Sequence, residues 1–145
     1  MNFLLDTNVL SEVRRPAPDA KVMAWLEQVD EDRVFLSVIS LAEIARGVVL
    51  LEAGRRRDEL AAWLEHDLPT RFAGRIVDVD LATAMSWGRF MGMAKREGHG
   101  LSVMDGWIAA AAEVQGLTLV TRNIKDFESL GIRLLDPWTG WHSPA

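Results

Sequence analysis

The sequence predicts an α/β fold, a three-layer α/β/α sandwich around a central, mainly parallel sheet of four to five strands. Strand-like and helix-like segments alternate along all 145 residues. The strand-like segments are short and almost entirely apolar, as expected of strands buried on both faces. Since no internal repeat, low-complexity run or linker breaks this alternation, we expect one domain at residues 1–138 and an aromatic tail at 139–145.

The composition excludes several classes of protein. The chain has no cysteine, which rules out disulfides, cysteine zinc sites and thiol catalysis, and makes a reducing cytoplasm the expected location. The net charge of -5 argues against general adhesion to nucleic acid but allows local basic patches. We expect no signal peptide and no membrane span, because the sequence has neither a basic start before an apolar run nor a long enough apolar stretch.

The first predicted elements are bounded by an acid and two prolines. A strand ends at Leu5, and the short helix predicted at 8–14 is stopped by Pro16 and Pro18. Asp19 is the expected N-cap of the helix that follows, because its side chain can accept from the first free backbone N–H groups.

Four further elements complete the first half of the chain. They are strand 33–37, helix 40–51, helix 55–66 and strand 75–79. We expect Gly54 to separate the two helices and Pro69 to close the second one.

The second half begins with a long helix capped by Asp80 and reaching about Glu97. Ser102 opens the next helix, which we expect to end at Gly116. The last predicted elements are strand 117–121, a short helix from 123 to about 131 and an edge strand at 132–135.

Four acids fall at comparable places in these elements. Asp6 directly follows the first strand, while Glu43, Asp105 and Asp126 lie in the first turns of predicted helices. The carboxyl ends of parallel strands share one rim of a sheet, so Asp6 and the helices carrying Glu43 and Asp126 are expected there. Asp105 joins them only if its helix packs with its start pointing to the same rim.

Each acid on its own also has a structural explanation. The first turns carry capping-box patterns, namely Ser40-x-x-Glu43, Ser102-x-x-Asp105 and the similar Asn123-x-x-Asp126. Acids in first helical turns are favoured by the helix dipole, and Asp6 can cap the short helix after it. A functional interpretation therefore depends on all four acids reaching one place.

A cluster of this kind suits hydrolysis assisted by a metal ion. Mg²⁺ and Mn²⁺ prefer oxygen ligands, and carboxylates that lie close together repel one another when no cation is present. With one or two ions, such a cluster can position a water, lower its pKa and neutralise charge on a phosphodiester. Thr7 and Asn8 are candidates to steady Asp6 or to bind a metal-bound water, and Asn8 is equally typical of a turn or cap.

The segments around the acids carry a resemblance to a known family. They are Leu5-Asp6-Thr7-Asn8-Val9-Leu10, Ser40-Leu41-Ala42-Glu43-Ile44, Asp105-Gly106-Trp107-Ile108-Ala109-Ala110 and Thr121-Arg122-Asn123-Ile124-Lys125-Asp126-Phe127. In this order they resemble PIN-domain ribonucleases, above all the VapC-type and FitB-type toxins of toxin–antitoxin systems. The likeness runs from Met1 to about Trp138.

The resemblance implies a parallel sheet between helices and an endoribonuclease that depends on Mg²⁺ or Mn²⁺. It also implies a homodimer that a small antitoxin holds inactive. By position, Asp6 and Asp105 would be the principal metal ligands, and Glu43 would complete the cluster directly or through water. Asp126 is favoured as the fourth catalytic acid and Asn123 as its neutral neighbour; if Asn123 holds the fourth position instead, a second metal ion would bind poorly.

Substrate and partner contacts are harder to place. Arg122, beside the fourth acid, is the best candidate for binding substrate phosphate, whereas the basic runs at 14–15 and 55–57 are expected to be solvated. The helices at 41–51 and 60–64 have more apolar surface than a small monomer needs, which indicates a partner groove.

Two functions remain open. The first is a metal-dependent endoribonuclease toxin with RNA as substrate and an antitoxin as partner. The second is a non-catalytic or weakly catalytic subunit that mainly binds an antitoxin, and reaches operator DNA only through it. An unrelated phosphatase or nucleotide-binding protein is disfavoured, because no second Asp follows Asp6 two residues on and no glycine-rich phosphate loop follows a strand.

Overall fold

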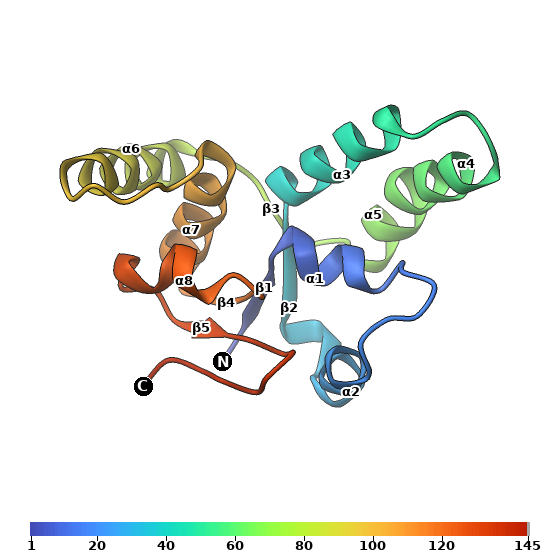
Figure 1. Cartoon of the computed structure of the whole chain (residues 1–145), viewed down its shortest axis with the longest axis horizontal. Coiled ribbons are helices and arrows are strands. Elements are labelled where there is room, and N and C mark those ends of the chain that lie inside the picture. Colours follow the sequence, from blue (N-terminus) through green and yellow to red (C-terminus); the bar gives the residue numbers. More distant parts are fainter. Residues whose placement is uncertain (145) are drawn as a thin grey trace.

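The centre of the structure is a sheet of five short strands, all parallel (Figure 1). This computed structural model describes residues 1–144. The strands are β1 (Phe3–Leu5), β2 (Val34–Ser37), β3 (Ile76–Val77), β4 (Thr118–Val120) and β5 (Leu134–Leu135), in the spatial order β3-β2-β1-β4-β5. The predicted α/β fold with a parallel sheet is therefore confirmed.

Helices cover both faces of the sheet and give the predicted three layers (Figure 1). They are α1 (Thr7–Glu12), α2 (Ala20–Gln28), α3 (Val38–Leu50), α4 (Arg55–Ala62), α5 (Leu68–Arg71), α6 (Leu81–Arg96), α7 (Val103–Gln115) and α8 (Ile124–Phe127). A π-helical turn, Trp63–Asp67, joins α4 to α5, and 3₁₀ turns lie at Glu31–Arg33 and Glu128–Leu130.

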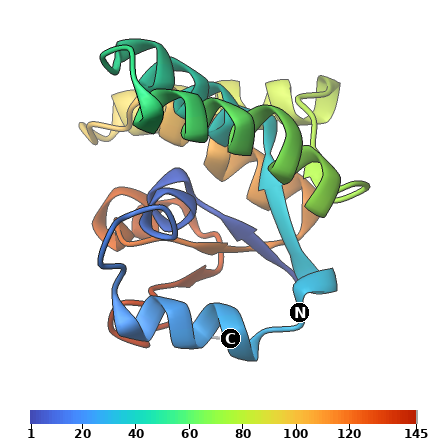
Figure 2. The ribbon, with the colours of Figure 1, turned by 90° about the vertical axis from the view of Figure 1, so that its right-hand side faces the viewer.

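Neighbouring strand residues enter two different cores, as the alternation of side chains along a strand requires. Leu4 packs with α6, α7 and α8, where Phe90, Ile108 and Phe127 are buried. Leu5 packs on the opposite face with residues of α1, α2, α3 and α5. In Figure 2, α2 lies at the bottom of the view, the α4–α5 helix at the top and α1 between them.

Several predicted helix ends are confirmed. Asp19 accepts from the N–H groups of Lys21 and Val22, and Asp80 accepts from that of Thr83. Ser102 caps α7, and Gly116 ends it in the left-handed conformation, with φ at 65°. These signals are local, so the sequence alone was enough to place them.

Three other predictions were wrong in detail. Helix α3 is capped by Ser37 and begins at Val38, so Ser40 lies inside the helix and forms no capping box with Glu43. Pro69 does not close its helix, because it lies in the first turn of α5. Backbone N–H groups in a first turn have no partner within that helix, so the N–H that proline lacks is not needed there. The side chain of Asn123 makes no cap on α8.

The chain after β5 folds back along that strand. Leu135 and His142 form an antiparallel bridge, and the backbone N–H of Ser143 donates to the carbonyl of Leu134 at 3.0 Å. The predicted boundary at 138 stays a prediction, and Ala145, the last residue of the predicted tail, lies outside the described residues. No helix within residues 1–144 is long and apolar enough to cross a membrane.

Two glycines test how backbone conformation contributes to the fold. A Cβ added at Gly47, inside α3, or at Gly116, at the end of α7, would meet no atom within 4 Å. We expect Gly47→Ala to raise the free energy of unfolding by about 0.5–1 kcal/mol, because alanine favours helix. Gly116→Ala should lower it by about 1–2 kcal/mol, because φ is positive there. Urea unfolding of both variants measures the two changes in the free energy of unfolding, and changes of the same sign would contradict this account.

Candidate active site

The candidate site lies where the order of the strands reverses. From β1 the chain fills one side of the sheet with β2 and β3, and later fills the other side with β4 and β5. Ligands bind at such a point, beyond the carboxyl ends of the two strands that flank it. Asp6 follows β1 and Thr121 follows β4, and their side chains meet: the Thr121 hydroxyl donates to Asp6 Oδ2 at 2.7 Å.

Asp6 is only 3% exposed and its carboxylate is held by donors on both oxygens. The backbone N–H of Thr7 donates to Oδ1 at 2.7 Å, so Asp6 does cap α1. Asn8 Nδ2 lies 3.3 Å from Oδ2, and Asn8 Oδ1 accepts from the N–H of Arg122 at 3.4 Å. Asn8 therefore links the segment after β1 to the segment after β4 and fixes the position of Asp6 between them.

Glu43 reaches the same edge from α3. The Thr7 hydroxyl donates to Glu43 Oε1 at 2.7 Å and lies 3.0 Å from the hydroxyl of Ser40. Ser40 is fully buried and stands one turn before Glu43 on the helix. Thr7 thus orients Glu43 by its side chain and Asp6 by its backbone.

Asp105 reaches the edge because α7 packs closely against α6. Gly106 has no side chain, and a Cβ there would lie 2.6 Å from Met91 Sδ and about 3 Å from the Trp87 ring. Trp87 also stacks on Trp107 with ring centroids 4.7 Å apart. This contact directs the start of α7, and with it Asp105, toward the acids of the other elements.

The electrostatics of the acids show their proximity. Burial, the largest cause, raises the pKa of Asp6 from 3.8 to about 6; hydrogen bonds from Thr121 and Thr7 oppose the rise, and the charges of Asp105 and Glu43 add to it. Burial also raises the pKa of Asp105, against a hydrogen bond from Ser102, and the charges of Asp126 and Glu43 raise it further. The structure therefore brings Asp6, Glu43 and Asp105 within electrostatic reach of one another, and Asp126 within electrostatic reach of Asp105.

This donor set fits a hard divalent cation. Within residues 1–144, no three Asp, Glu, His or Cys side chains are placed to hold an ion by themselves. Mg²⁺ commonly takes only one or two carboxylates and keeps several waters, so a closed protein cage is not required. Asp6 is a buried carboxylate whose hydrogen bonds do not offset its desolvation, and a cation beside it would complete the compensation.

The fourth position contains the two residues that the sequence left open. Asp126 is exposed, its N–H donates to the Asn123 carbonyl at 3.1 Å, and its charge acts on Asp105. Asn123 is tied instead by its backbone N–H to the Thr121 hydroxyl at 3.0 Å. Both line a hollow of about 440 Å³ together with Arg122, whose guanidinium lies 5.1 Å from the ring centroid of Trp138.

Two functional side chains were missed in the sequence. The local sequence pattern indicates no role for Thr121 and favours Ser40 only as a helix cap. Thr121 holds Asp6, and Ser40 lies beside the Thr7–Glu43 contact. A hydroxyl directly after an apolar strand, as at Thr121, was the available signal.

Comparison with known proteins points to one family. The family model described as PIN domain matches residues 3–132. The chain is 38% identical over 136 residues to Toxin FitB of Neisseria gonorrhoeae, which covers 94% of this chain and 98% of that protein. It is 36% identical over 136 residues to VapC ribonuclease Y4jK of Sinorhizobium fredii, covering 94% and 97%. A solved structure of FitAB bound to the IR36 DNA fragment superposes with a TM-score of 0.87 at 37% identity, covering 94% and 95%.

The raised pKa of Asp6 predicts how stability depends on pH without metal. Between 3.8 and about 6 the folded state holds a proton that the unfolded state has lost, so rising pH destabilises the fold. From about pH 4 to about pH 7, wild-type protein should lose about 3 kcal/mol relative to Asp6→Asn. Chemical unfolding in EDTA measures this difference, and parallel pH profiles for the two proteins would refute it.

Proposed function

Because the chain belongs to the PIN domain family, we propose that it is the toxin of a toxin–antitoxin pair and an endoribonuclease that depends on Mg²⁺ or Mn²⁺. The observation that carries this proposal is the gathering of Asp6, Glu43 and Asp105 at the switch point of the sheet. The names of the two relatives, a toxin and a VapC ribonuclease, support it.

The residues have separate tasks in this proposal. Asp6 and Asp105 hold the cation, with Glu43 acting directly or through water, and Asp126 is the fourth acid. A bound divalent ion supplies an activated water and neutralises charge on the phosphodiester. Hydrogen bonds from Asn8 and Thr121 keep the Asp6 carboxylate in one orientation, so the carboxylate loses little orientational freedom when the cation binds.

Arg122 is the proposed phosphate contact. Its guanidinium is exposed and rests against Trp138, so the planar group is partly ordered while its N–H donors stay free for substrate. Its backbone N–H is bonded to Asn8, which places the residue beside Asp6. RNA bound over the acids would contact the Arg122 guanidinium. The proposed activity would take place in the cytoplasm, where RNA substrate is abundant.

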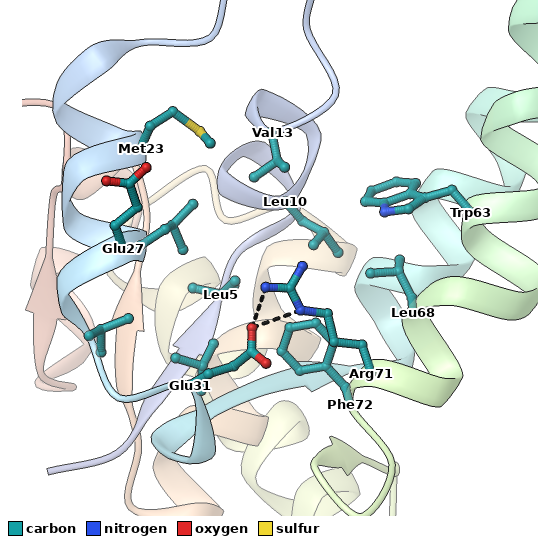
Figure 3. A pocket seen from close by; sticks show the side chains of 13 residues that line it. Leu5, Leu10, Val13, Met23, Glu27, Glu31, Trp63, Leu68, Arg71 and Phe72 are labelled. Carbon is teal, nitrogen blue, oxygen red and sulfur yellow. Dashed lines mark hydrogen bonds and ion pairs between the residues drawn. The ribbon is translucent and has the colours of Figure 1, made fainter.

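A partner surface is part of the proposal. Figure 3 shows a hollow between α1, α2 and α5, lined by side chains that include the ion pair of Arg71 and Glu31. Its volume is about 490 Å³. Most of its lining is apolar, including Leu10, Leu26 and Phe72. Such a groove suits the apolar face of an antitoxin segment. The FitAB complex with DNA supports operator DNA being reached through the antitoxin.

A second copy of the chain is the other proposed partner. Leu81 and Met85 lie one turn apart on α6 and are 79% and 70% exposed. Apolar side chains so exposed on one helix face are typical of a surface that another subunit covers. The proposed homodimer would bury this face and leave the acids open.

The alternative, a subunit that only binds an antitoxin, predicts no cleavage by the isolated chain. We expect purified protein to cut RNA with Mg²⁺ or Mn²⁺ and not in EDTA. Asp6→Asn and Asp105→Asn should each lower the rate by more than about a hundredfold, since even residues that only support a metal ligand cost 10–100-fold. Asp126→Asn should lower the rate of RNA cleavage more than Asn123→Ala if Asp126 is the fourth acid. Asp32→Asn, at an exposed turn, is the control; cleavage that survives EDTA would reject the proposal.

The partner hollow can be tested separately. Met23 and Ala24 are neighbours on α2, but only Met23 lines the hollow. Met23→Arg should reduce co-purification of the co-expressed antitoxin by about tenfold or more, because it buries a charge against the apolar wall. Ala24→Arg, which adds the same charge on an exposed position, should have little effect. RNA cleavage by the free toxin should be unchanged in both, and equal antitoxin binding would place the partner elsewhere.

A further inference from the structure

A smaller hollow opens directly beside the acids. It has a volume of about 210 Å³ and lies between α1, α3, α4 and the π turn. Thr7 and Glu43 line its end nearest the candidate metal site, and Arg14 and Arg56 line it as well. We call this hollow the Arg14 groove, defined by Thr7, Arg14, Glu43, Gly47, Arg56 and Trp63.

Arg14 is not the solvated residue that the sequence suggested. Its Nε is buried and has no hydrogen-bond partner among residues 1–144. Its guanidinium lies 5.4 Å from the ring centroid of Trp63, and its carbonyl accepts from Arg56 Nη2 at 3.2 Å. A buried donor without an acceptor is costly, so a small shift of the Arg14 guanidinium toward an acceptor supplied by a ligand in the groove would be favoured.

The floor of the groove is apolar and open. Gly47 lies inside α3 with no positive φ, so its conformation does not require glycine. A Cβ at this position would meet nothing within 4 Å, and the absent side chain leaves the floor free. Val48 and Leu60 extend the apolar lining. An apolar floor beside two cations suits a base with its phosphate.

We propose that the Arg14 groove binds the nucleotide of a single-stranded RNA that lies one position beyond the two nucleotides joined by the cleaved phosphodiester. A phosphate oxygen of that nucleotide accepts from Arg14, with Arg56 beside it, and the base rests over Gly47 next to Trp63. The inference rests on the proposed ribonuclease function, because the groove can hold substrate RNA only if the acids next to it, Glu43 among them, cleave RNA. Phosphate contacts of this kind position the strand, while the base contact adds preference.

A peptide is the competing occupant, since the apolar surface of these helices also suits a partner. The groove has less than half the volume of the hollow in Figure 3, about 210 Å³ against 490 Å³. Two arginines, Arg14 and Arg56, line the groove, whereas the one arginine that lines the larger hollow, Arg71, is paired with Glu31. Size and charge therefore favour a nucleotide.

The test uses RNA of increasing length. A dinucleotide spanning the mapped cleavage site is extended one nucleotide at a time on each side, and kcat/KM is measured with Mg²⁺. For wild-type protein, the extension that fills the groove should raise kcat/KM by about tenfold. Arg14→Gln, Arg56→Gln and Gly47→Phe should each lose that gain and keep the dinucleotide rate.

Matched controls exclude a general effect of charge. Arg15 and Arg55 are the chain neighbours of Arg14 and Arg56 and do not line the groove. Arg15→Gln and Arg55→Gln should keep the extension gain. Binding of extended RNA is measured at several salt concentrations in proteins that also carry Asp105→Asn. Adding Arg14→Gln should make the slope of the log binding constant against log salt concentration less steep by about 0.7, because one phosphate contact disappears.

The outcomes separate this inference from the function it rests on. Absence of cleavage by wild-type protein rejects both. Cleavage with an intact extension gain in Arg14→Gln and Gly47→Phe rejects the groove alone. Equal losses on the dinucleotide and on extended RNA also reject it, since the variants then damage the catalytic centre. Normal cleavage together with weaker co-purification of the co-expressed antitoxin assigns the groove to the protein partner and overturns the proposal.

Discussion

The desolvated carboxylate of Asp6 is the constraint on which the site depends. Its backbone N–H bonds to the Val120 carbonyl at 2.9 Å and extends the pairing of β1 with β4, which holds the residue in the crevice between them. Donors from Thr7, Asn8 and Thr121 do not offset the burial, and the pKa stays raised. Folding therefore leaves at this point an unfavourable negative charge, which is the condition under which a cation binds well.

A different kind of contact positions each of the other acids: Glu43 and Asp105 near Asp6, and Asp126 near Asp105. A hydroxyl, that of Thr7, orients Glu43. A missing side chain, at Gly106, lets α7 approach α6 and aims Asp105. The short turn after β4 presents Asp126. Because these contacts involve separate elements, the acids meet only when β1, β2 and β4 have assembled with α7, and the unfolded chain cannot hold the same cluster.

The sequence predicted what is decided locally. Alternating apolar and helical segments placed all five strands, and caps such as Asp19, Asp80 and Ser102 depend on bonds within three residues. Local sequence does not distinguish Ser37 from Ser40 as the cap of α3, because both precede apolar helical residues, and only tertiary contacts show that Ser40 is buried against Thr7. The bond from Thr121 to Asp6 spans 115 positions, and no local pattern contains it.

Trp63 connects the two hollows of this face. It lines both the hollow between α1, α2 and α5 and the Arg14 groove, and the Arg14 guanidinium lies over its ring. It stands at the start of the π turn, a local irregularity that tends to occur at functional positions. A ligand that shifts this ring from one side changes the wall of the other hollow and the support of Arg14. The two proposed sites therefore share one side chain, and Trp63 is the residue through which binding in one hollow would be coupled to binding in the other.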